Sequence, residues 1–398
     1  MVNRYAAIAL TWSSIFLVVM AILVNSSALF YMAAAVIATL LASRLQAWLA
    51  VRYLRFERYT APAVKVGENV VVEIVVWSER QLKRPLVHVV DELPARLVTS
   101  GLTPSLPVAP SFDQPIKTRY QFRPMRRGRY RWDKLKVIGT DALGLVTMEK
   151  EFRTEAVELT VYPTPLPVTE DIKPLLGWGA SDVESGRTRG AGLDPRGIRE
   201  FSHGDPLRYI HWRSSAKRGK LMVKEFETGS GLSLHFILQR QDGTDIGDEK
   251  SSTFEAMCGH ALFLAVDYAK KGGMVIFPLQ EGRDAANAHS EVRERMVREV
   301  LTDIQPTSRE SLAEDVATAR RSVRPGETVV VFVGVQDPLL PSAIAAWPDV
   351  QVTVLAYDPS EYGRMSSEQR SATDPRYIDA LEVAGANVVI MPRVERIG

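Results

Sequence analysis

The stretch that decides the fold of the C-terminal region is TVVVFVGV, at residues 328–335. A second run of the same kind, VQVTVLAY, occupies residues 350–357. Nearly continuous runs of β-branched and apolar residues are typical of parallel strands, because helices cover both faces of such a sheet and leave neither face polar. The two runs therefore predict buried parallel strands.

Strand and helix patterns alternate around these two runs. Further short apolar runs predict strands at Leu232–Leu238, Met274–Leu279 and Asn387–Met391. Helices are predicted from the capping box Ser252-x-x-Glu255, from i, i+4 apolar spacing over 292–304, and at Pro375–Val383. Such alternation over residues 231–398 predicts an α/β domain with a doubly wound sheet.

Composition sets the broad class of the whole chain. It has 398 residues, with 49 Lys and Arg against 47 Asp and Glu, a net charge of +2. This balance argues against a disordered chain and against a dedicated nucleic-acid binder, whose phosphate contacts leave a basic surplus. Two or three domains are expected at this length. The lone Cys258 cannot form an internal disulfide, which fits a reducing compartment.

The first fifty residues are strongly apolar. Ala6–Val24 carries no charge and approaches the roughly 20 residues that a spanning helix needs. After the polar break Asn25–Ser27, apolar character resumes at Ala28 and weakens past Arg44. We therefore predict a transmembrane helical hairpin over residues 1–58. A cleaved signal peptide is the alternative for the first run.

Basic residues flank this hairpin on both sides but are absent from its loop. Arg4 precedes the hairpin, and the residues that follow it are Arg44, Arg52, Arg55 and Arg58. By the positive-inside rule, both ends of a multi-pass anchor face the cytoplasm, and so do all residues after 60. The lipid bilayer is thus the first expected partner.

Residues 59–165 read as a β-sandwich, because several short strands alternate with Pro- and Gly-bearing turns. Val64–Trp77 predicts two strands around a turn at Gly67–Asn69, and later strands are expected at 86–90, 118–122, 130–138 and 156–162. The cluster Arg126–Arg129 fits a site for phosphate or a lipid headgroup. A solvated hairpin turn is the simpler interpretation, and we favour it.

Residues 166–230 form a segment dense in Gly, Arg and acidic residues. Three interpretations stand: a metal site built on His203, Asp205 and His211, an arginine clamp for anions, and a structural network of ion pairs. The spacing matches no zinc motif such as H-E-x-x-H, and no phosphate loop accompanies the arginines. The structural network is favoured.

The same segment resembles a bacterial family, domain of unknown function 58. The resemblance rests on REF at 199–201, GDPLR at 204–208, IHWR at 210–213, SA at 215–216 and LMVKEFE at 221–227, with RGRY at 127–130 and DALGL at 141–145 upstream. It implies a membrane hairpin, an immunoglobulin-like β domain and a von Willebrand factor A-like α/β domain. It also implies association with a MoxR-type AAA+ ATPase, and often with a transglutaminase-like membrane protein.

A von Willebrand A-like domain with a metal site would carry D-x-S-x-S after its first strand, where a divalent cation finds oxygen ligands. This chain has Gln239, Gln241 and Gly243 at those positions, with Arg240 among them. Other acidic residues, namely Asp242, Asp245 and Asp337, are out of register with the motif. We therefore expect the fold without a metal or other cofactor.

These observations favour a membrane-tethered, non-enzymatic interaction or scaffold protein in the bacterial inner membrane, with cytoplasmic soluble domains. The alternative is a metal-dependent hydrolase using the His203, Asp205 and His211 segment. No catalytic residue is assigned. The binding candidates are the charged and aromatic residues of the family motifs: Arg199, Glu200, His203, Asp205, Arg208, His211, Trp212, Arg213, Lys224, Glu225 and Glu227.

Overall fold

The computed structural model describes residues 4–81, 86–97, 103–112, 114–168, 195–200, 214–215, 217, 219–226, 233–248, 251–270, 273–279, 290–325 and 327–393. The chain divides into two compact units, Met1–Tyr162 and Pro163–Gly398. Each unit is described by itself below.

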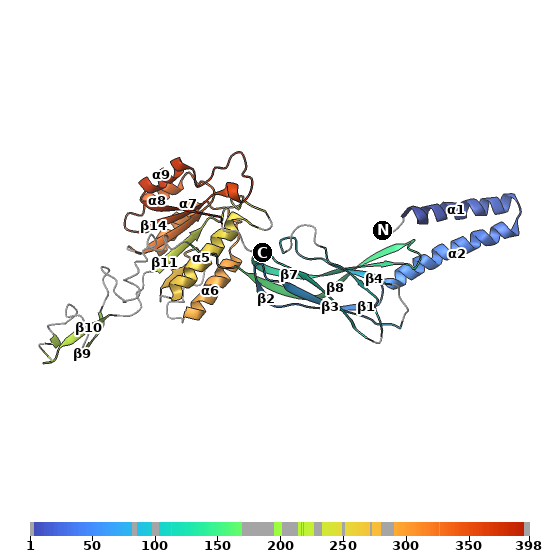
Figure 1. Ribbon diagram of the computed structural model, residues 1–398, viewed down its shortest axis with the longest axis horizontal. Helices are drawn as coiled ribbons and strands as arrows, with labels where there is room; N and C mark the ends of the chain where they lie inside the picture. The colour runs from blue at the N-terminus through green and yellow to red at the C-terminus, as the bar shows by residue number, and fades with distance from the viewer. Residues whose placement is uncertain are drawn as a thin grey trace. The chain divides into compact units, whose positions relative to one another are not determined.

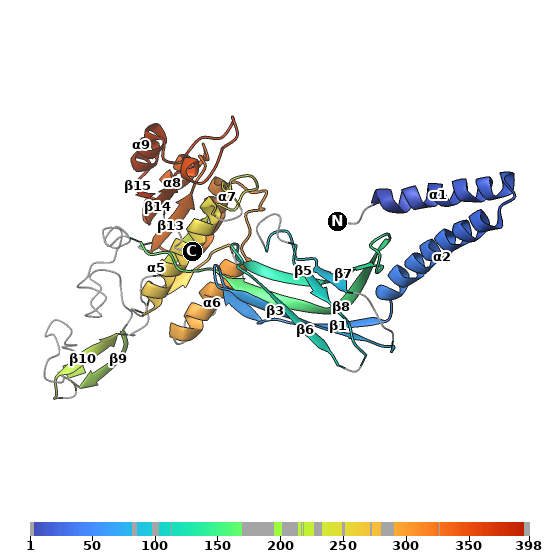
Figure 2. The same cartoon turned by 45° about the vertical axis from the view of Figure 1, so that its right-hand side comes forward.

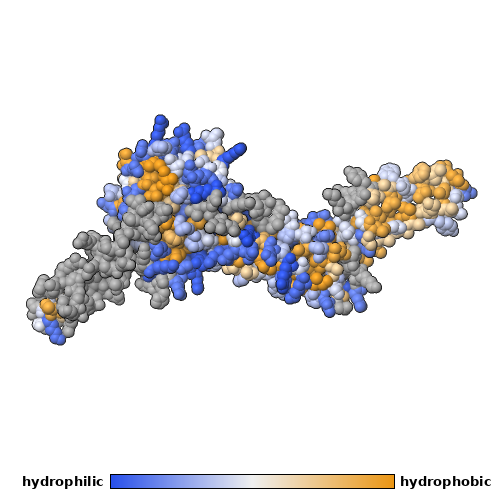
Figure 3. Space-filling view, in the orientation of Figure 1, coloured by the Kyte–Doolittle hydropathy of each residue, from blue (hydrophilic) through white to orange (hydrophobic). Residues whose placement is uncertain are grey.

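The first unit begins with two long apolar helices, α1 (Arg4–Leu23) and α2 (Ser27–Ala50). Both are long and apolar enough to cross a membrane. They pack on each other through small side chains, since Ser14, Ala21 and Ala33 are buried. Large apolar side chains point outward instead, as Trp12 and Tyr31 show with 68% and 72% exposure. Figure 3 shows this apolar surface in orange over the hairpin.

A two-layer β-sandwich follows the hairpin. One sheet has the order β1-β3-β6, and the other has the order β2-β8-β7-β4-β5. Both sheets contribute to one core, which includes Ile74, Leu135, Val137 and Leu159. The strands are β1 (Leu54–Tyr59), β2 (Ala63–Lys65), β3 (Val70–Ser78), β4 (Val87–Asp91), β5 (Ser105–Val108), β6 (Ile116–Phe122), β7 (Gly128–Thr140) and β8 (Thr147–Tyr162).

Arg58, expected as a charge that flanks the membrane, lies inside this sandwich. Its Nη2 donates to Asp91 Oδ1 at 2.8 Å, and neither side chain is exposed. Tyr120 donates its hydroxyl to Asp91 Oδ2 at 2.6 Å. Burial raises the pKa of Asp91, and the Arg58 charge opposes this rise only in part. Arg52 and Arg55 are therefore the first exposed basic residues after α2.

The second unit holds a five-stranded sheet in the order β12-β11-β13-β14-β15, in which every neighbouring pair is parallel. The strands are β11 (Ser233–Leu238), β12 (Met274–Ile276), β13 (Thr328–Val333), β14 (Gln351–Tyr357) and β15 (Ala386–Met391). The runs at 328–335 and 350–357 thus form adjacent buried strands, as predicted.

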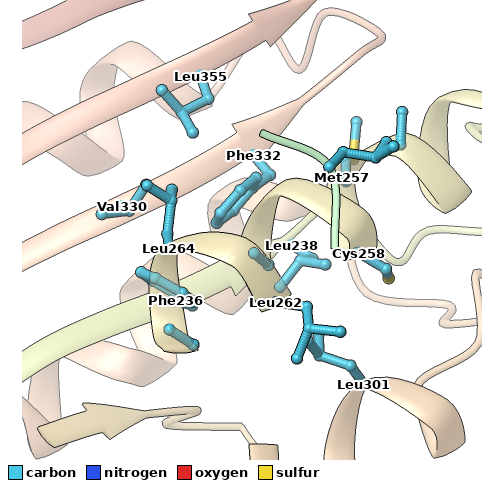
Figure 4. Close-up of a cluster of buried hydrophobic side chains, with 14 of the residues drawn as sticks. Phe236, Leu238, Met257, Cys258, Leu262, Leu264, Leu301, Val330, Phe332 and Leu355 are labelled. Carbon is cyan, nitrogen blue, oxygen red and sulfur yellow. The ribbon is translucent and has the colours of Figure 1, made fainter. Parts of the chain in front are cut away.

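Helices cover both faces of this sheet (Figures 1 and 2). On one face, α5 (Thr253–Lys270) and α6 (Ser290–Asp303) pack against Phe236 and Phe332. Figure 4 shows this core, with Cys258 buried within it. The other face carries α7 (Leu312–Ala319), α8 (Leu340–Ala345) and α9 (Pro375–Val383). The doubly wound α/β class predicted from the sequence is therefore observed.

Candidate functional site at the carboxyl edge of the parallel sheet

The site is located by the strand order. The chain moves from β11 outward to β12 and then returns to the other side of β11 as β13. In doubly wound sheets, ligands bind beyond the carboxyl ends of the strands at such a reversal. Leu238 and Phe332 pair near these ends. The loops at 239–248 and 334–339 therefore form the candidate site, which we call the rim.

Gln239, the first residue of the rim, is a buried clamp. Its Oε1 accepts hydrogen bonds from the backbone N–H groups of Gly334 (2.9 Å) and Val335 (3.0 Å). Its Nε2 donates to the carbonyl of Val335 at 2.8 Å. Both polar atoms of the side chain thus hold the two loops together, and the buried amide has hydrogen-bond partners.

The next residue, Arg240, is held by a buried carboxylate. Its Nη2 and Nε donate to Asp315 Oδ1 (2.7 Å) and Oδ2 (3.2 Å). Burial raises the pKa of Asp315, while the hydrogen bond and charge of Arg240 oppose that rise. The carbonyl of Arg240 also accepts from the N–H of Ser308 at 2.8 Å. The cation is therefore a fixed part of the rim.

Asp337 lies on the β13 side of the rim and is also fully engaged. Its Oδ2 accepts from the N–H of Ala313 at 2.8 Å, in the first turn of α7, and its Oδ1 accepts from Leu339 at 3.0 Å. The Tyr377 hydroxyl donates to its carbonyl at 2.9 Å. Burial raises the pKa of that tyrosine. This carboxylate orders a helix start and a loop.

The donor set of the rim does not fit a hard divalent cation. Such an ion needs several free oxygen ligands, whereas Gln239 and Asp337 already accept backbone hydrogen bonds, and Arg240 adds a positive charge. Gly243 has φ of +80°, where a serine would be strained. Within the described ranges, no group of three or more His, Cys, Asp or Glu is arranged to hold a metal.

The family motifs lie partly on an antiparallel ribbon of β9 (Pro195–Glu200) and β10 (Met222–Phe226). The register places Arg199 opposite Val223 and Glu200 opposite Met222, and it places Lys224 and Glu225 opposite residues 198 and 197. No strand was predicted for these residues from the sequence. Neither RGIRE nor MVKEF alternates apolar and polar residues, so the usual pattern of a strand was absent.

The remaining motif candidates lie outside the described residues: His203, Asp205, Arg208, His211, Trp212, Arg213 and Glu227. Next to this gap, Ser215 Oγ accepts from the N–H of Met222 at 2.8 Å, and both side chains are buried. The metal-hydrolase and anion-clamp interpretations therefore stay predictions.

The Arg126–Arg129 cluster lies in a turn of the first unit that is held by hydrogen bonds within the protein. The Tyr130 hydroxyl donates to the carbonyl of Arg126 at 3.0 Å. The side chain of Arg127 is buried, and Gly128 adopts φ of +142°. These contacts agree with the hairpin-turn interpretation, except that Arg127 is not solvated.

Three comparisons place the chain among known proteins. A relative from Bacillus subtilis (strain 168), named "Uncharacterized protein YeaD", is 27% identical over 224 residues, or 52% of this chain and 54% of the relative. The chain thus matches about half the length of that relative.

Among solved structures, two β domains are similar to part of the chain. A CARDB domain from Pyrococcus furiosus is 15% identical, with a TM-score of 0.19, and covers 27% of this chain and 86% of its own. A PKD domain of an M14-like peptidase from a Thermoplasmatales archaeon is 12% identical, with a TM-score of 0.16, and covers 25% and 91%. With scores this low, we base the sandwich on the strand pairing described above.

The family comparison bears on the second unit. The model described as "Protein of unknown function DUF58" matches residues 197–361, which include β10 and the strands β11 to β14. This match confirms the resemblance drawn from the motifs at 199–227. The chain is therefore similar to the DUF58 family over residues 197–361.

Proposed function

We propose that the protein is a membrane-tethered scaffold whose α/β domain is a von Willebrand A-like module that binds a partner without a metal ion. The observation that carries this proposal is the closed rim: Gln239, Arg240 and Asp337 form hydrogen bonds within the protein where a metal-dependent module would present free oxygen ligands. A rigid rim of this kind suits docking.

The tether is supported by the hairpin. Its outward side chains are large and apolar, and its buried ones are small, which is the reverse of a soluble helix pair. Exposed basic residues, Arg52 and Arg55, follow α2. By the positive-inside rule, this arrangement favours a cytoplasmic location for the β-sandwich and for the second unit.

The partner that we propose is a MoxR-type AAA+ ATPase, as the family resemblance implies. Leu339, 64% exposed at the rim beside Asp337, is the natural apolar contact. Val383, at the end of α9, is also apolar and is 89% exposed. It lies just before β15 begins, and therefore at the opposite edge of the same sheet. Substitution of Leu339 therefore tests docking at the rim, and the same substitution of Val383 serves as its control.

Capture of the ATPase by the full-length protein in lipid nanodiscs tests the proposal. With ATP, ADP or no nucleotide present, we expect capture in at least one state. Leu339→Asp should abolish capture, while Val383→Asp should retain it. Failure in all three nucleotide states would refute the partner, and equal loss in both variants would refute docking at the rim.

A further inference from the structure

The end of α2 is built into the β-sandwich. The buried side chains Ser43, Ala47 and Ala50 form one stripe of the helix. Gly139 of β7 lies against this stripe, and a Cβ there would be 2.9 Å from Ala50 Cβ and 2.8 Å from Val51 Cγ1. Only glycine allows this approach without displacement of the helix. The spanning helix and the sandwich are therefore directly joined.

The turn between β7 and β8 is fastened to the same helix. The N–H of Ala142 donates to Gln46 Oε1 at 3.1 Å. Asp141 is buried in the turn, where its Oδ1 accepts from the N–H of Val146 at 2.8 Å. Desolvation would raise the pKa of Asp141, but this bond, the Ser43 hydroxyl and further backbone bonds lower it. The turn thus has a fixed position along α2.

That position is the level of the membrane interface. Arg44, the first charge after the apolar run of α2, precedes Gln46 by two residues, or about 3 Å along the axis. Arg52 stacks over the Trp48 ring at 4.1 Å, and this pairing of Trp with Arg suits the headgroup region. The β7–β8 turn, held against Gln46, is therefore level with the boundary between headgroups and acyl chains. Both ribbon views show the tip of this hairpin beside the end of α2 (Figures 1 and 2).

The surface of the β7–β8 turn is uncharged and apolar, as contact with the membrane interface requires. Residues 142–148 read ALGLVTM, without a charge. Leu143 is 63% exposed, and Gly144 at φ of +68° sets the tight bend behind it. An exposed leucine at the tip of a rigid hairpin is stabilised by burial in an apolar environment.

We propose that residues 142–146 are a second membrane contact, which inserts Leu143 into the interface of the same bilayer that α1 and α2 span. This inference rests on the proposed tether. The tip is distinct from the Arg126–Arg129 turn, which lies at the other end of β7, because the thirteen residues of this strand extend about 40 Å.

Single-cysteine labelling tests the inference on the full-length protein in phosphatidylcholine–phosphatidylglycerol vesicles. Cys258 is the only cysteine, so a Cys258→Ala background accepts one environment-sensitive fluorophore at a chosen site. The three sites are Leu143→Cys at the tip, Ile37→Cys within α2, and Val71→Cys. Val71 is 45% exposed and lies seven residues along β3 from Ser78, which pairs with Leu54 at the α2 end.

We expect lipid-borne quenchers to quench the label at 37 and at 143, and aqueous iodide to quench the label at 71. If the label at 37 is quenched from the lipid while the label at 143 behaves like that at 71, the hairpin spans the membrane and the second contact is refuted. If the label at 37 is not quenched from the lipid, the tether itself is refuted, and the second contact with it.

Discussion

The guanidinium of Arg240 forms a two-pronged hydrogen bond with the carboxylate of Asp315, at 2.7 and 3.2 Å, across 75 residues of sequence. The Asp315 side chain is completely buried, and that of Arg240 is 18% exposed. A buried carboxylate depends on such a partner, because removal of one member leaves an uncompensated charge. This pair ties the loop after β11 to α7.

Arg240→Met should therefore lower the free energy of unfolding by about 3 kcal/mol, since it leaves Asp315 without its cation. Urea denaturation in neutral detergent measures the change. The double variant Arg240→Met with Asp315→Leu should recover most of the loss, because both charges are then absent. The matched control is Arg298→Met, which removes a part-exposed pair with Glu294 on α6 and should cost about 0.5 kcal/mol. Equal losses in the two single variants would contradict this account.

Gly139→Ala should destabilise the first unit by about 1–3 kcal/mol, because the added methyl meets Ala50 and Val51 and forces α2 away from β7. Limited proteolysis at the junction after Ala50 and the unfolding midpoint both report the change. A suitable control is Gly334→Ala, whose new methyl would lie 3.3 Å from the flexible end of Met257 and in ordinary van der Waals contact with Thr253. An unchanged midpoint in Gly139→Ala would show that α2 does not dock on β7.

Glu327 should make the second unit sensitive to acid. Desolvation would raise its pKa, but the hydrogen bond with His235 Nε2 at 2.8 Å and the backbone N–H of Arg324 lower it below the ordinary value of 4.5. The folded state thus binds this proton less tightly than the unfolded chain does. The interaction stabilises the fold above that ordinary value and is lost as pH falls through the lowered pKa.

Stability measured by urea titration between about pH 6 and pH 3 should therefore fall less steeply in Glu327→Gln than in the parent chain. The exposed Glu291→Gln, in the first turn of α6, serves as control. Parallel curves for parent and Glu327→Gln would exclude a role for this pair.

The sequence predicted the C-terminal sheet well because parallel strands that are covered on both faces consist of nearly continuous runs of apolar residues. Thr328–Val333 and Gln351–Tyr357 needed no other information. The strand β1 was missed because Arg55 and Glu57 alternate with partly buried residues in a short, charged segment. The burial of Arg58 was not predictable, since its partner Asp91 is a distant residue that only the strand pairing brings near.

The sequence pointed to the loop after β11 as the candidate site, but it did not predict the contacts of that loop. The rule for doubly wound sheets pointed to the residues after Leu238. The clamp by Gln239 requires knowledge that β13 lies next to β11, and the role of Asp315 requires the position of α7. A signal for that helix was present, because Ser311 and Glu314 form a capping box that the structure contains. The pairing of β9 with β10 was likewise not predicted, because both strands lie in a segment rich in glycine and charged residues.

Binding of Mn²⁺ tests the central claim most directly, because this ion substitutes for Mg²⁺ and is counted by electron paramagnetic resonance. For the full-length protein in neutral detergent, we predict no saturable site, and no difference between the parent and Asp242→Asn, which removes an exposed carboxylate of the rim. One Mn²⁺ bound per chain, and lost in Asp242→Asn or Asp337→Asn, would contradict a rim that works by docking alone.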